Sequence, residues 1–458
     1  MKKAFVIQAF VVLGLLLAAG MVQSGAADKT GTAGGKRFEG VTLKVGNMLG
    51  WPVLEPLWTR LEQFKQETGI TVSLQSQPMA QFRDSQMQDA LQHTGTFDVY
   101  LLPASHWEIL STYVVPVEDF MLKEGIDVAK FKARLNAPPE DITYKGKLTY
   151  MMANGMGVQS GYYRKDLFDD PKEQKAFKEK YGYDLGAPKT IEQMVQIAEF
   201  FTRDTNKDGQ VDLWGLLQAG KGNHGYGMFQ HQLKNSNLDI LNNDHKCTWG
   251  REYPAERAQV LKIAQHNRDL IWKHKVTPPE VVGMQMAEIS QLWFAGKAAM
   301  IVGWIHDIWG QVKTDAVKAK IGQSVSFVFP KWVAGAPSFG GGWCWAVNKD
   351  SKVADAGWEF IEFAIREDTQ KYLSENNKAI FAPIFTDLAK WAADTLLIPP
   401  SFAQETKLVR MRFFLEEAQV TSVMQTLHEK LMANQITPEQ FVDMSADQIN
   451  KIVAKRKR

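Results

Sequence analysis

The residues of this sequence best suited to chemistry are aromatic side chains that stand beside glycines or after probable strands. A flat ring offers a platform on which the apolar C–H face of a sugar can stack, while amide, imidazole, carboxylate and backbone groups reach the hydroxyl edge. The chain has 14 tryptophans. This supply of rings favours the capture of a small molecule over its chemical conversion.

Several of these side chains follow directly after predicted strands. Trp51 follows the first strand, residues 105–107 follow the third, and Trp304 follows a strand over 298–302. Open α/β sheets bind ligands at the carboxyl ends of their strands. We therefore expect these side chains to gather at such edges, with packing in the core as the alternative for each ring.

Trp343 and Trp345 flank a cysteine directly after three glycines, at 340–342. A backbone without side chains lets a ligand or a facing lobe approach closely. Alternation along a strand places both indoles on the same side, so both face solvent or both are buried.

Motifs of known catalytic sites are missing. The sequence has no Gly-x-Ser-x-Gly, no His-Glu-x-x-His and no phosphate-binding Gly-x-x-x-x-Gly-Lys-Ser/Thr. His224 and His231 are too far apart to be neighbours on a helix face, and the pair Glu118 and Asp119 reads as a solvated turn. We expect no catalytic residue and no cofactor.

The segment 204–212 opens like a calcium loop, with Asp204, Asn206 and Asp208 at alternate positions and a glycine next. The twelfth position, where a glutamate would close the cage, is Gly215. A structural Asx turn is the favoured interpretation and a weak calcium site the alternative. We expect no bound metal.

The first 27 residues have the pattern of a secretory signal. Lys2 and Lys3 precede an apolar run over 5–22, and small residues allow cleavage after Ala26 or Ala27. An uncleaved anchor is the alternative. No cysteine lies near the cleavage site, which argues against a lipid anchor. We expect an exported protein of the periplasm.

Charge and cysteine content exclude two further classes. The formal charge of +2 falls to about zero (2 − 2 = 0) once Lys2 and Lys3 leave with the signal. That balance gives no basic surface for nucleic acid. Two cysteines, Cys247 and Cys344, make no disulfide framework. Whether they pair stays open, and two buried free thiols are favoured.

Hydrophobic periodicity after a glycine-rich leader at 28–37 predicts an α/β domain. Val41, Leu43 and Val45 alternate with polar residues as in a strand, a helical pattern ends near Gly69, and residues 97–102 form an apolar strand before Pro103. Such an unbroken run suits a strand that is covered on both faces. The middle of the chain and the stretch after 399 are mostly helical.

Three stretches resemble one known family. They are residues 161–168 (GYYRKDLF), 294–300 (FAGKAAM) and 340–347 (GGGWCWAV). In this order the chain resembles the extracellular solute-binding proteins of sugar-type ABC importers, the group that includes maltose-binding protein. The resemblance implies an α/β fold of the two-lobed type II periplasmic binding protein class, each lobe a mixed sheet flanked by helices, with a hinge between the lobes.

The same resemblance implies how the chain divides. It predicts crossings between lobes near 152–158, 329–334 and 380–383. The expected parts are a signal peptide (1–27), a flexible leader (28–37), an N-terminal lobe (38–152 plus 331–380) and a C-terminal lobe (153–330 plus 381–458).

The resemblance also adds weaker site candidates. His224 and Tyr226 stand in a glycine-rich stretch like the family's ligand-lining segment, and Met156 stands at the first crossing. For His106 and His306 a structural hydrogen bond is the alternative. The candidate ligand-binding residues are Asn47, Trp51, Ser105, His106, Trp107, Met156, His224, Tyr226, Trp304, His306, Asp307, Trp343 and Trp345.

The function implied is that of a monomeric periplasmic substrate-binding component. It would capture a neutral sugar or oligosaccharide between its lobes and deliver it to an ABC transporter membrane permease. The candidate positions hold no strongly acidic cluster and no basic trio, which favours a neutral ligand. The alternatives are a sensor that presents its closed form to a signalling receptor, a binder of a non-sugar solute, and a periplasmic enzyme on the same scaffold.

Overall fold

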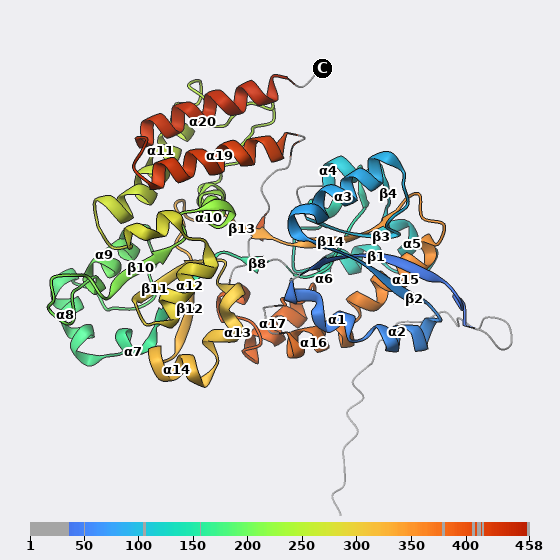
Figure 1. Ribbon diagram of the computed structural model, residues 1–458, viewed down its shortest axis with the longest axis horizontal. Coiled ribbons are helices and arrows are strands. Elements are labelled where there is room, and N and C mark those ends of the chain that lie inside the picture. The colour runs from blue at the N-terminus through green and yellow to red at the C-terminus, as the bar shows by residue number, and fades with distance from the viewer. Residues whose placement is uncertain are drawn as a thin grey trace, which may run out of the picture.

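The computed structural model describes residues 36–49, 51–103, 107–155, 157–377, 381–404, 408–409, 414 and 416–455. Two lobes stand side by side, each built on its own β-sheet (Figure 1). A short three-stranded sheet of β8, β13 and β15 lies between them. The two-lobed architecture and the mixed sheets expected from the sequence are confirmed.

The sheet of the first lobe has the order β2-β1-β3-β14-β4, with β7 paired to β14. β1 is parallel to β2 and β3, whereas β14 runs antiparallel to β3. Its strands are β1 (Thr42–Leu49), β2 (Thr71–Pro78), β3 (Val99–Pro103), β4 (Val114–Val115), β7 (Met151–Met152) and β14 (Trp343–Asn348). Its helices are α1 (Glu55–Trp58), α2 (Leu61–Thr68), α3 (Met79–Gln92), α4 (Trp107–Leu110), α5 (Val117–Lys123), α6 (Val128–Arg134), α15 (Ala354–Ile365) and α16 (Glu367–Asn376).

The sheet of the second lobe has the order β10-β11-β9-β12, in which β9 is antiparallel to both neighbours. Its strands are β9 (Ser160–Arg164), β10 (Trp214–Gln218), β11 (Ala298–Gly303) and β12 (Ser324–Val328). Its helices are α7 (Lys165–Phe168), α8 (Pro171–Tyr181), α9 (Ile191–Phe201), α10 (Gly222–Lys234), α11 (Pro254–Trp272), α12 (Met286–Phe294), α13 (Trp309–Val312), α14 (Asp315–Ile321), α18 (Pro400–Gln404), α19 (Glu417–Met432) and α20 (Pro438–Val453). The last two helices pack on α10 and α11 and share a core with them.

Short elements complete the description. They are β5 (Thr143–Tyr144), β6 (Lys147–Leu148), β8 (Gly157–Val158), β13 (Ser338–Gly341), β15 (Leu408–Val409), α17 (Thr386–Asp394) and the 3-10 turns η1 (Pro52–Leu54), η3 (Pro139–Ile142), η4 (Pro279–Gly283) and η5 (Ile305–Ile308).

Local signals in the sequence explain several element ends. Gly69 ends α2 at φ 86°, a left-handed conformation that glycine adopts without strain. The Thr190 hydroxyl caps α9 by accepting the Gln193 N–H at 3.1 Å. β3 is buried along its whole length, as its unbroken apolar run predicts.

The chain passes between the sheets through the central strands. β7 belongs to the first sheet, β8 pairs with β13, and β9 belongs to the second sheet, so the first transition lies between Met152 and Ser160. The return occurs through β13 and β14. Trp332 still packs on His266 of α11, with ring centroids 5.4 Å apart, and the Val333 N–H donates to Asn235 O. The first lobe therefore resumes later than residue 331, because the segment after β12 first packs on the second lobe.

The third transition also lies later than expected. Asn136 N–H donates to Ile384 O at 2.6 Å, and Arg134 pairs with Asp387 at 3.2 Å. These contacts hold α17 against the first lobe, although residues 381 onward were expected in the second. The Ser401 N–H, in α18, donates to Ser326 Oγ of β12. The transition therefore lies between α17 and α18.

Cys247 and Cys344 are both buried and free. No helix within the described ranges has the length and apolarity needed to cross a bilayer.

Candidate functional site

An aromatic cluster occupies the carboxyl edge of the first sheet. β14 is antiparallel to β3, so its first residue, Trp343, lies opposite Pro103 at the end of β3. The rings of Trp51 and Trp343 have centroids 5.3 Å apart at an interplanar angle of 44°. Phe82 of α3 packs on Trp343 at 6.2 Å. Both tryptophans are half-buried, so each keeps ring surface that a ligand can contact.

Of two further candidates on the first lobe, Asn47 lies near this edge and Trp107 lies in the core. Asn47, on β1, donates through Nδ2 to Ser76 Oγ at 2.9 Å and remains half-buried. Trp107 is 3% exposed, stacks on Tyr150 at 5.5 Å and donates its indole N–H to Leu102 O. Contrary to the expectation, the indole of Trp107 lies in the core in this structure and offers no ring surface to a ligand.

Trp345 is likewise a core residue. It is 0% exposed and packs edge-on against Phe360 of α15, with centroids 5.4 Å apart, and against Trp58 at 6.2 Å. The expectation that both indoles of this strand share one environment is therefore wrong. β14 runs from the rim of the sheet inward, so Trp343 stays at the edge while α1 and α15 cover Trp345.

Trp304 lies on the second-lobe side of the junction, directly after β11. Its ring packs on Phe339 of β13, with centroids 5.8 Å apart. A methyl group at Gly341 would come within 3.2 Å of Trp304 Cη2, and one at Gly227 would come within 3.2 Å of its Nε1. Two glycines on different elements thus make room for this half-buried indole beside the strand that leads to Trp343.

Tyr226, on α10, is 0% exposed and stacks on Phe229, so its ring belongs to the second-lobe core rather than to an open surface. Its hydroxyl is buried close to the side chain of Gln230. Burial and, to a lesser degree, Glu417 raise the pKa of that hydroxyl well above its usual value. His224 is tied to α12 within the same lobe, with its Nδ1 3.1 Å from Gln285 Oε1.

The remaining candidates cannot be placed as side chains. Ser105, His106 and Met156 lie outside the described residues. His306 and Asp307 lie in η5, after β11, and only their backbone is described.

Three polar residues outside the list of candidates lie at the junction, and of these only Gln159, near the first crossing, is a weak candidate on sequence grounds. Gln159, between β8 and β9, is 0% exposed, and both its amide atoms are buried without a partner in the described structure. A methyl group at Gly227 would lie 3.1 Å from its Nε2, so Gln159 adjoins Trp304. Arg83, on α3, places its guanidinium carbon 5.6 Å from the centre of the Trp343 ring.

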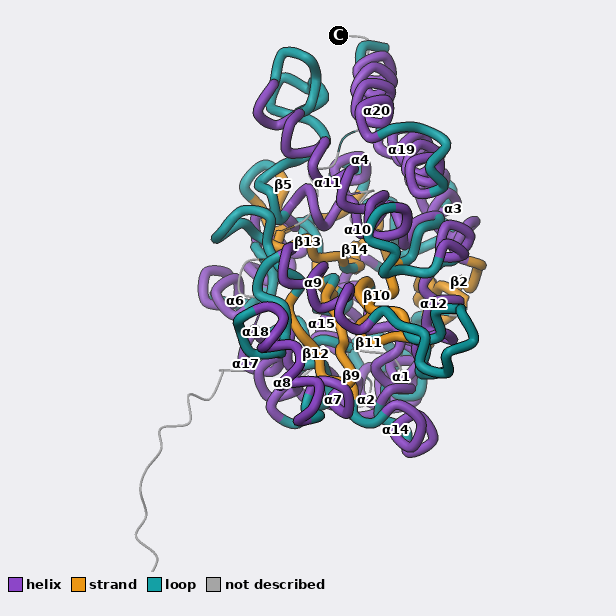
Figure 2. The backbone as a smooth tube through the Cα atoms, turned by 90° about the vertical axis from the view of Figure 1, so that its left-hand side faces the viewer, coloured by secondary structure: helices purple, strands orange, loops and turns teal. Residues whose placement is uncertain are grey.

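Glu417, the first residue of α19, is the third. Burial raises the pKa of its carboxyl to about 8, and the positive charge of Arg83 partly offsets that rise. Burial lowers the pKa of Arg83, against opposing effects of Glu417 and Asp84. The helix α19 lies near α3 in both views (Figures 1 and 2). Arg83 of the first lobe and Glu417 of the second therefore lie close enough to influence each other's pKa.

We call the following set the junction cluster. It comprises Trp51, Phe82, Arg83 and Trp343 of the first lobe with Gln159, Tyr226, Trp304 and Glu417 of the second. The first-lobe members contribute half-buried aromatic surface, and the second-lobe members contribute buried polar atoms beside a half-buried indole. Such an arrangement suits a ligand with apolar faces and hydroxyl edges. No pattern in the sequence marks Arg83 or Glu417, since each sits in an ordinary amphipathic helix.

The segment 204–212 forms a self-capped turn. The Asp204 carboxylate accepts the N–H groups of Lys207 at 2.6 Å and Gly209 at 2.7 Å, and Asp212 accepts from the N–H and hydroxyl of Thr205. The loop's own donors therefore occupy the oxygens that a cation would need, which supports the structural turn. Within the described ranges, no group of three or more His, Cys, Asp or Glu side chains is arranged to hold a metal ion.

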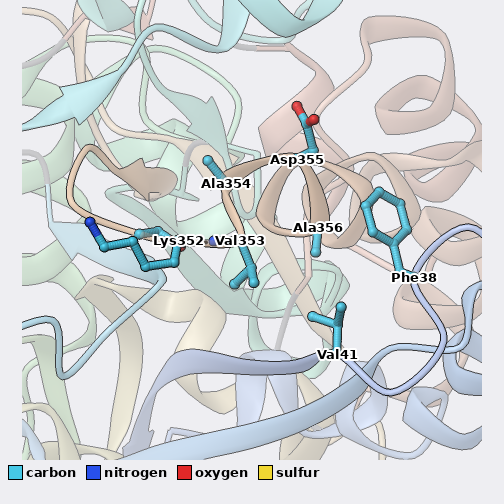
Figure 3. A pocket seen from close by; sticks show the side chains of 8 residues that line it. Phe38, Val41, Lys352, Val353, Ala354, Asp355 and Ala356 are labelled. Carbon is cyan, nitrogen blue, oxygen red and sulfur yellow. Dashed lines mark hydrogen bonds between the residues drawn. The ribbon is translucent and has the colours of Figure 1, made fainter.

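A separate hollow of about 400 Å³ lies on the first lobe, away from the junction cluster (Figure 3). It is lined by Phe38, Val41 and residues 351–356. Asp355 at its rim pairs with Lys123 at 3.0 Å, and no tryptophan or tyrosine lines it. Phe38 is the one aromatic side chain in its lining, so the hollow offers less stacking surface than the junction cluster.

Comparison with known proteins agrees with this architecture. The family model for bacterial extracellular solute-binding proteins matches residues 51–371. The maltose-bound MalE3 of T. maritima has a TM-score of 0.69 at 21% identity, covering 90% of this chain and 100% of that one. The sugar-binding protein MalE of Xanthomonas citri has a TM-score of 0.70 at 16% identity, covering 91% and 98%.

A D-mannitol-bound ABC transporter solute-binding protein of Agrobacterium vitis has a TM-score of 0.67 at 18% identity, covering 90% of this chain and 98% of that one. At such identities the likeness shows the fold, which is that of the two-lobed type II periplasmic binding proteins. The family model spans well over half of the sequence. The chain therefore belongs to the family of bacterial extracellular solute-binding proteins.

Proposed function

We propose that this protein is the periplasmic substrate-binding component of an ABC importer and that its ligand is a neutral sugar, sugar alcohol or oligosaccharide. The observation that carries the proposal is the junction cluster, which combines the half-buried rings of Trp51 and Trp343 on the first lobe with buried polar atoms on the second. Stacking holds the apolar faces of a sugar ring, and the polar atoms hold its hydroxyls.

A site shared by two lobes would couple ligand binding to closure of the protein. A ligand that contacts both lobes makes more contacts in the closed arrangement than in the open one, so binding shifts the population towards closure. Only that closed form then docks on the membrane permease. The signal pattern at 1–27 supports export to the periplasm. We expect the binding protein to act as a monomer and to leave its ligand chemically unchanged.

The ligands bound to similar proteins support a neutral ligand with many hydroxyl groups. The relative from T. maritima is bound to maltose, and the one from Agrobacterium vitis is bound to D-mannitol. Both ligands are uncharged and carry many hydroxyl groups. The junction cluster offers the same combination of rings and polar atoms.

A melting screen of the mature protein against neutral sugars, sugar alcohols, amino acids and polyamines tests the ligand class. At a free ligand concentration 100-fold above Kd, binding stabilises the folded state by about 2.7 kcal/mol. We expect upward shifts confined to sugars or sugar alcohols. Shifts with amino acids or polyamines alone would contradict the proposal. Native mass spectrometry of gently purified protein would identify a ligand that co-purifies.

A transport assay separates the importer from a sensor that presents its closed form to a receptor. Deleting this gene should abolish uptake of the radiolabelled sugar found in the screen, and a plasmid copy should restore it. Unchanged uptake together with a lost transcriptional response to the same sugar would favour the sensor.

A further inference from the structure

Two segments of the chain, β7 to β8 and β13 to β14, run antiparallel between the first sheet and the short sheet between the lobes (Figure 1). In the first sheet Met152 pairs with Cys344, and in the short sheet Gly157 pairs with Gly341. Four residues separate these pairings on the first segment and only two on the second. Two extra residues on one strand disrupt the ladder and bend it, as in a β-bulge. The paired segments therefore bend between the two sheets.

Asn154 stands where the ladder between β7 and β14 ends. Just before it, the Ala153 N–H donates to Trp343 O at 2.8 Å, as in a regular antiparallel pair. The N–H of Trp343 donates to a side-chain oxygen instead, Asn154 Oδ1, at 3.3 Å. The half-buried amide of Asn154 thus replaces a backbone carbonyl and extends the ladder by one hydrogen bond, to the residue that carries the indole.

The backbone beside Asn154 is fixed in the first lobe. Asn154 Nδ2 donates to Gly155 O at 2.9 Å, and the Gly155 N–H donates to Ala382 O at 2.6 Å. A methyl group at Gly155 would lie 2.4 Å from Pro383 O, so glycine is needed for this close approach. Ile384, next in the chain, accepts a backbone hydrogen bond from the loop after α6 of the first lobe. Asn154 therefore ties Trp343 to an anchored part of that lobe.

The bend between the sheets falls directly beside the indole. Gly342 lies between Trp343 and the short sheet and has no side chain that pins the backbone to either lobe. The ring of Trp343 packs on Trp51 and Phe82, with centroid distances of 5.3 and 6.2 Å. A rotation at Gly342 would turn the indole away from these rings unless the backbone of Trp343 is held. The Asn154 amide holds it on the side of the bend.

We propose that Asn154 is a positioning residue, which acts on the ligand only through Trp343 and keeps that indole on the first lobe while the segments bend between the lobes. This inference rests on the proposed function, since it concerns the ring on which the sugar stacks. A platform that is already in place when the ligand arrives does not have to be ordered on binding. Removing the Asn154 amide therefore weakens binding, although every group that contacts the sugar is kept.

Calorimetric titration with the neutral sugar found in the melting screen measures this effect. Asn154→Ala removes the acceptor of the Trp343 N–H, and Asn154→Leu does so while keeping most of the side-chain volume, in case the alanine variant folds poorly. Asn154→Asp keeps an oxygen acceptor. The matched control is Asn242→Ala, because Asn242 is also a half-buried asparagine whose side-chain oxygen accepts two backbone N–H groups, each at 3.0 Å, in a turn of the second lobe.

We expect Asn154→Ala and Asn154→Leu to weaken binding at least fivefold, the scale of one lost hydrogen bond. Asn154→Asp should bind more tightly than Asn154→Ala, and Asn242→Ala should bind as the wild type does.

Circular dichroism of the unliganded protein reports the position of the indole itself. The rings of Trp51 and Trp343 are close enough for their electronic transitions to couple, and this coupling disappears when either indole is removed. The difference between spectra recorded with and without Trp51→Phe isolates it from the signals of the other tryptophans. The difference should shrink in the Asn154→Ala and Asn154→Leu backgrounds and keep its wild-type amplitude in Asn242→Ala. A loss of stability alone would not change it in folded protein.

The failure of the positioning role and that of the proposed function give different results. Wild-type affinity in Asn154→Ala, or weak binding with a difference spectrum of full amplitude, would overturn the positioning role and leave the proposed function standing. If no neutral sugar binds the wild type, the proposed function fails. The spectra of the unliganded variants then still decide whether Asn154 holds the indole.

Discussion

Two tryptophans on one strand, only two positions apart, have different roles. Trp343 is half-buried at the rim of the first sheet beside Trp51 and Phe82, whereas Trp345 is 0% exposed beneath Phe360. The first can offer its ring to a ligand, and the second can only stabilise the lobe. Truncating each to alanine therefore separates binding from stability.

We expect Trp343→Ala to weaken binding of the neutral sugar found in the screen at least tenfold, a loss of about 1.4 kcal/mol. The matched control is Trp345→Ala, which should lower the free energy of unfolding by about 3–5 kcal/mol because it leaves a core cavity. Titration calorimetry and urea unfolding on both variants measure the two quantities. Unchanged affinity in Trp343→Ala, with a stability loss as large as that of Trp345→Ala, would place Trp343 in the core.

Buried histidines make the second lobe sensitive to acid. Burial lowers the pKa of His428 to about 4, and neither ring nitrogen has a hydrogen-bond partner among the described residues. Burial together with Lys331 lowers the pKa of His231 to about 3. An unfolded histidine has a pKa of about 6.5, so below that pH the unfolded state binds more protons than the folded state. Stability therefore falls as the pH falls from 6.5 towards 4.

His428→Leu should remove one such contribution. The replacement loses no described hydrogen bond and keeps an apolar contact with Phe229, whose ring centroid lies 6.1 Å from that of His428. Between pH 7.5 and pH 5.5 the wild type should lose about 1.4 kcal/mol more stability than the variant. Urea unfolding at both pH values gives this difference. If the wild type and the variant lose the same amount of stability between the two pH values, His428 must be able to take up a proton in the folded state.

At the scale of elements, the loop over 204–212 looks like a cation site in sequence but caps itself in the structure. Asp204 accepts the backbone N–H groups of Lys207, Asp208 and Gly209, an arrangement that fixes the turn between α9 and β10. The loop is exposed, so each backbone N–H that loses Asp204 as its acceptor can form a hydrogen bond with water instead. Removing the Asp204 side chain should therefore lower the free energy of unfolding only moderately.

We expect Asp204→Ala to lower the free energy of unfolding by about 1 kcal/mol. Calcium chloride and EDTA should each leave the melting temperature of the wild type unchanged, because the carboxylates already hold the loop's own donors. A calcium-dependent rise in melting temperature that disappears in Asp204→Ala would instead identify the loop as a calcium site.

At the scale of the whole molecule, local patterns predicted the elements better than the contacts between them. The alternation around Leu43 and Val45 and the apolar run before Pro103 anticipate β1 and β3, since strand burial follows directly from side-chain period. Trp107 was placed at the site and lies in the core instead. Its burial comes from stacking on Tyr150, a contact that the residues beside Trp107 in the sequence do not specify.

The junction cluster shows the same limit. Trp51 and Trp343 stand beside glycines in the sequence, and that context identified them. Arg83 and Glu417 have no local signal, because their importance comes from two helices, α3 and α19, that only the fold brings together. Residues that two distant helices bring near each other are recognisable only once the fold is known.

The central claim is that a neutral sugar binds between the lobes at the junction cluster. A crystal structure of the mature protein with the sugar that gives the largest melting shift tests it most directly. We predict a sugar ring stacked on Trp343, with hydroxyls within hydrogen-bond distance of Arg83 and Glu417. A ligand bound in the hollow beside Phe38 and Ala354, or one that leaves Trp343 untouched, would contradict the account.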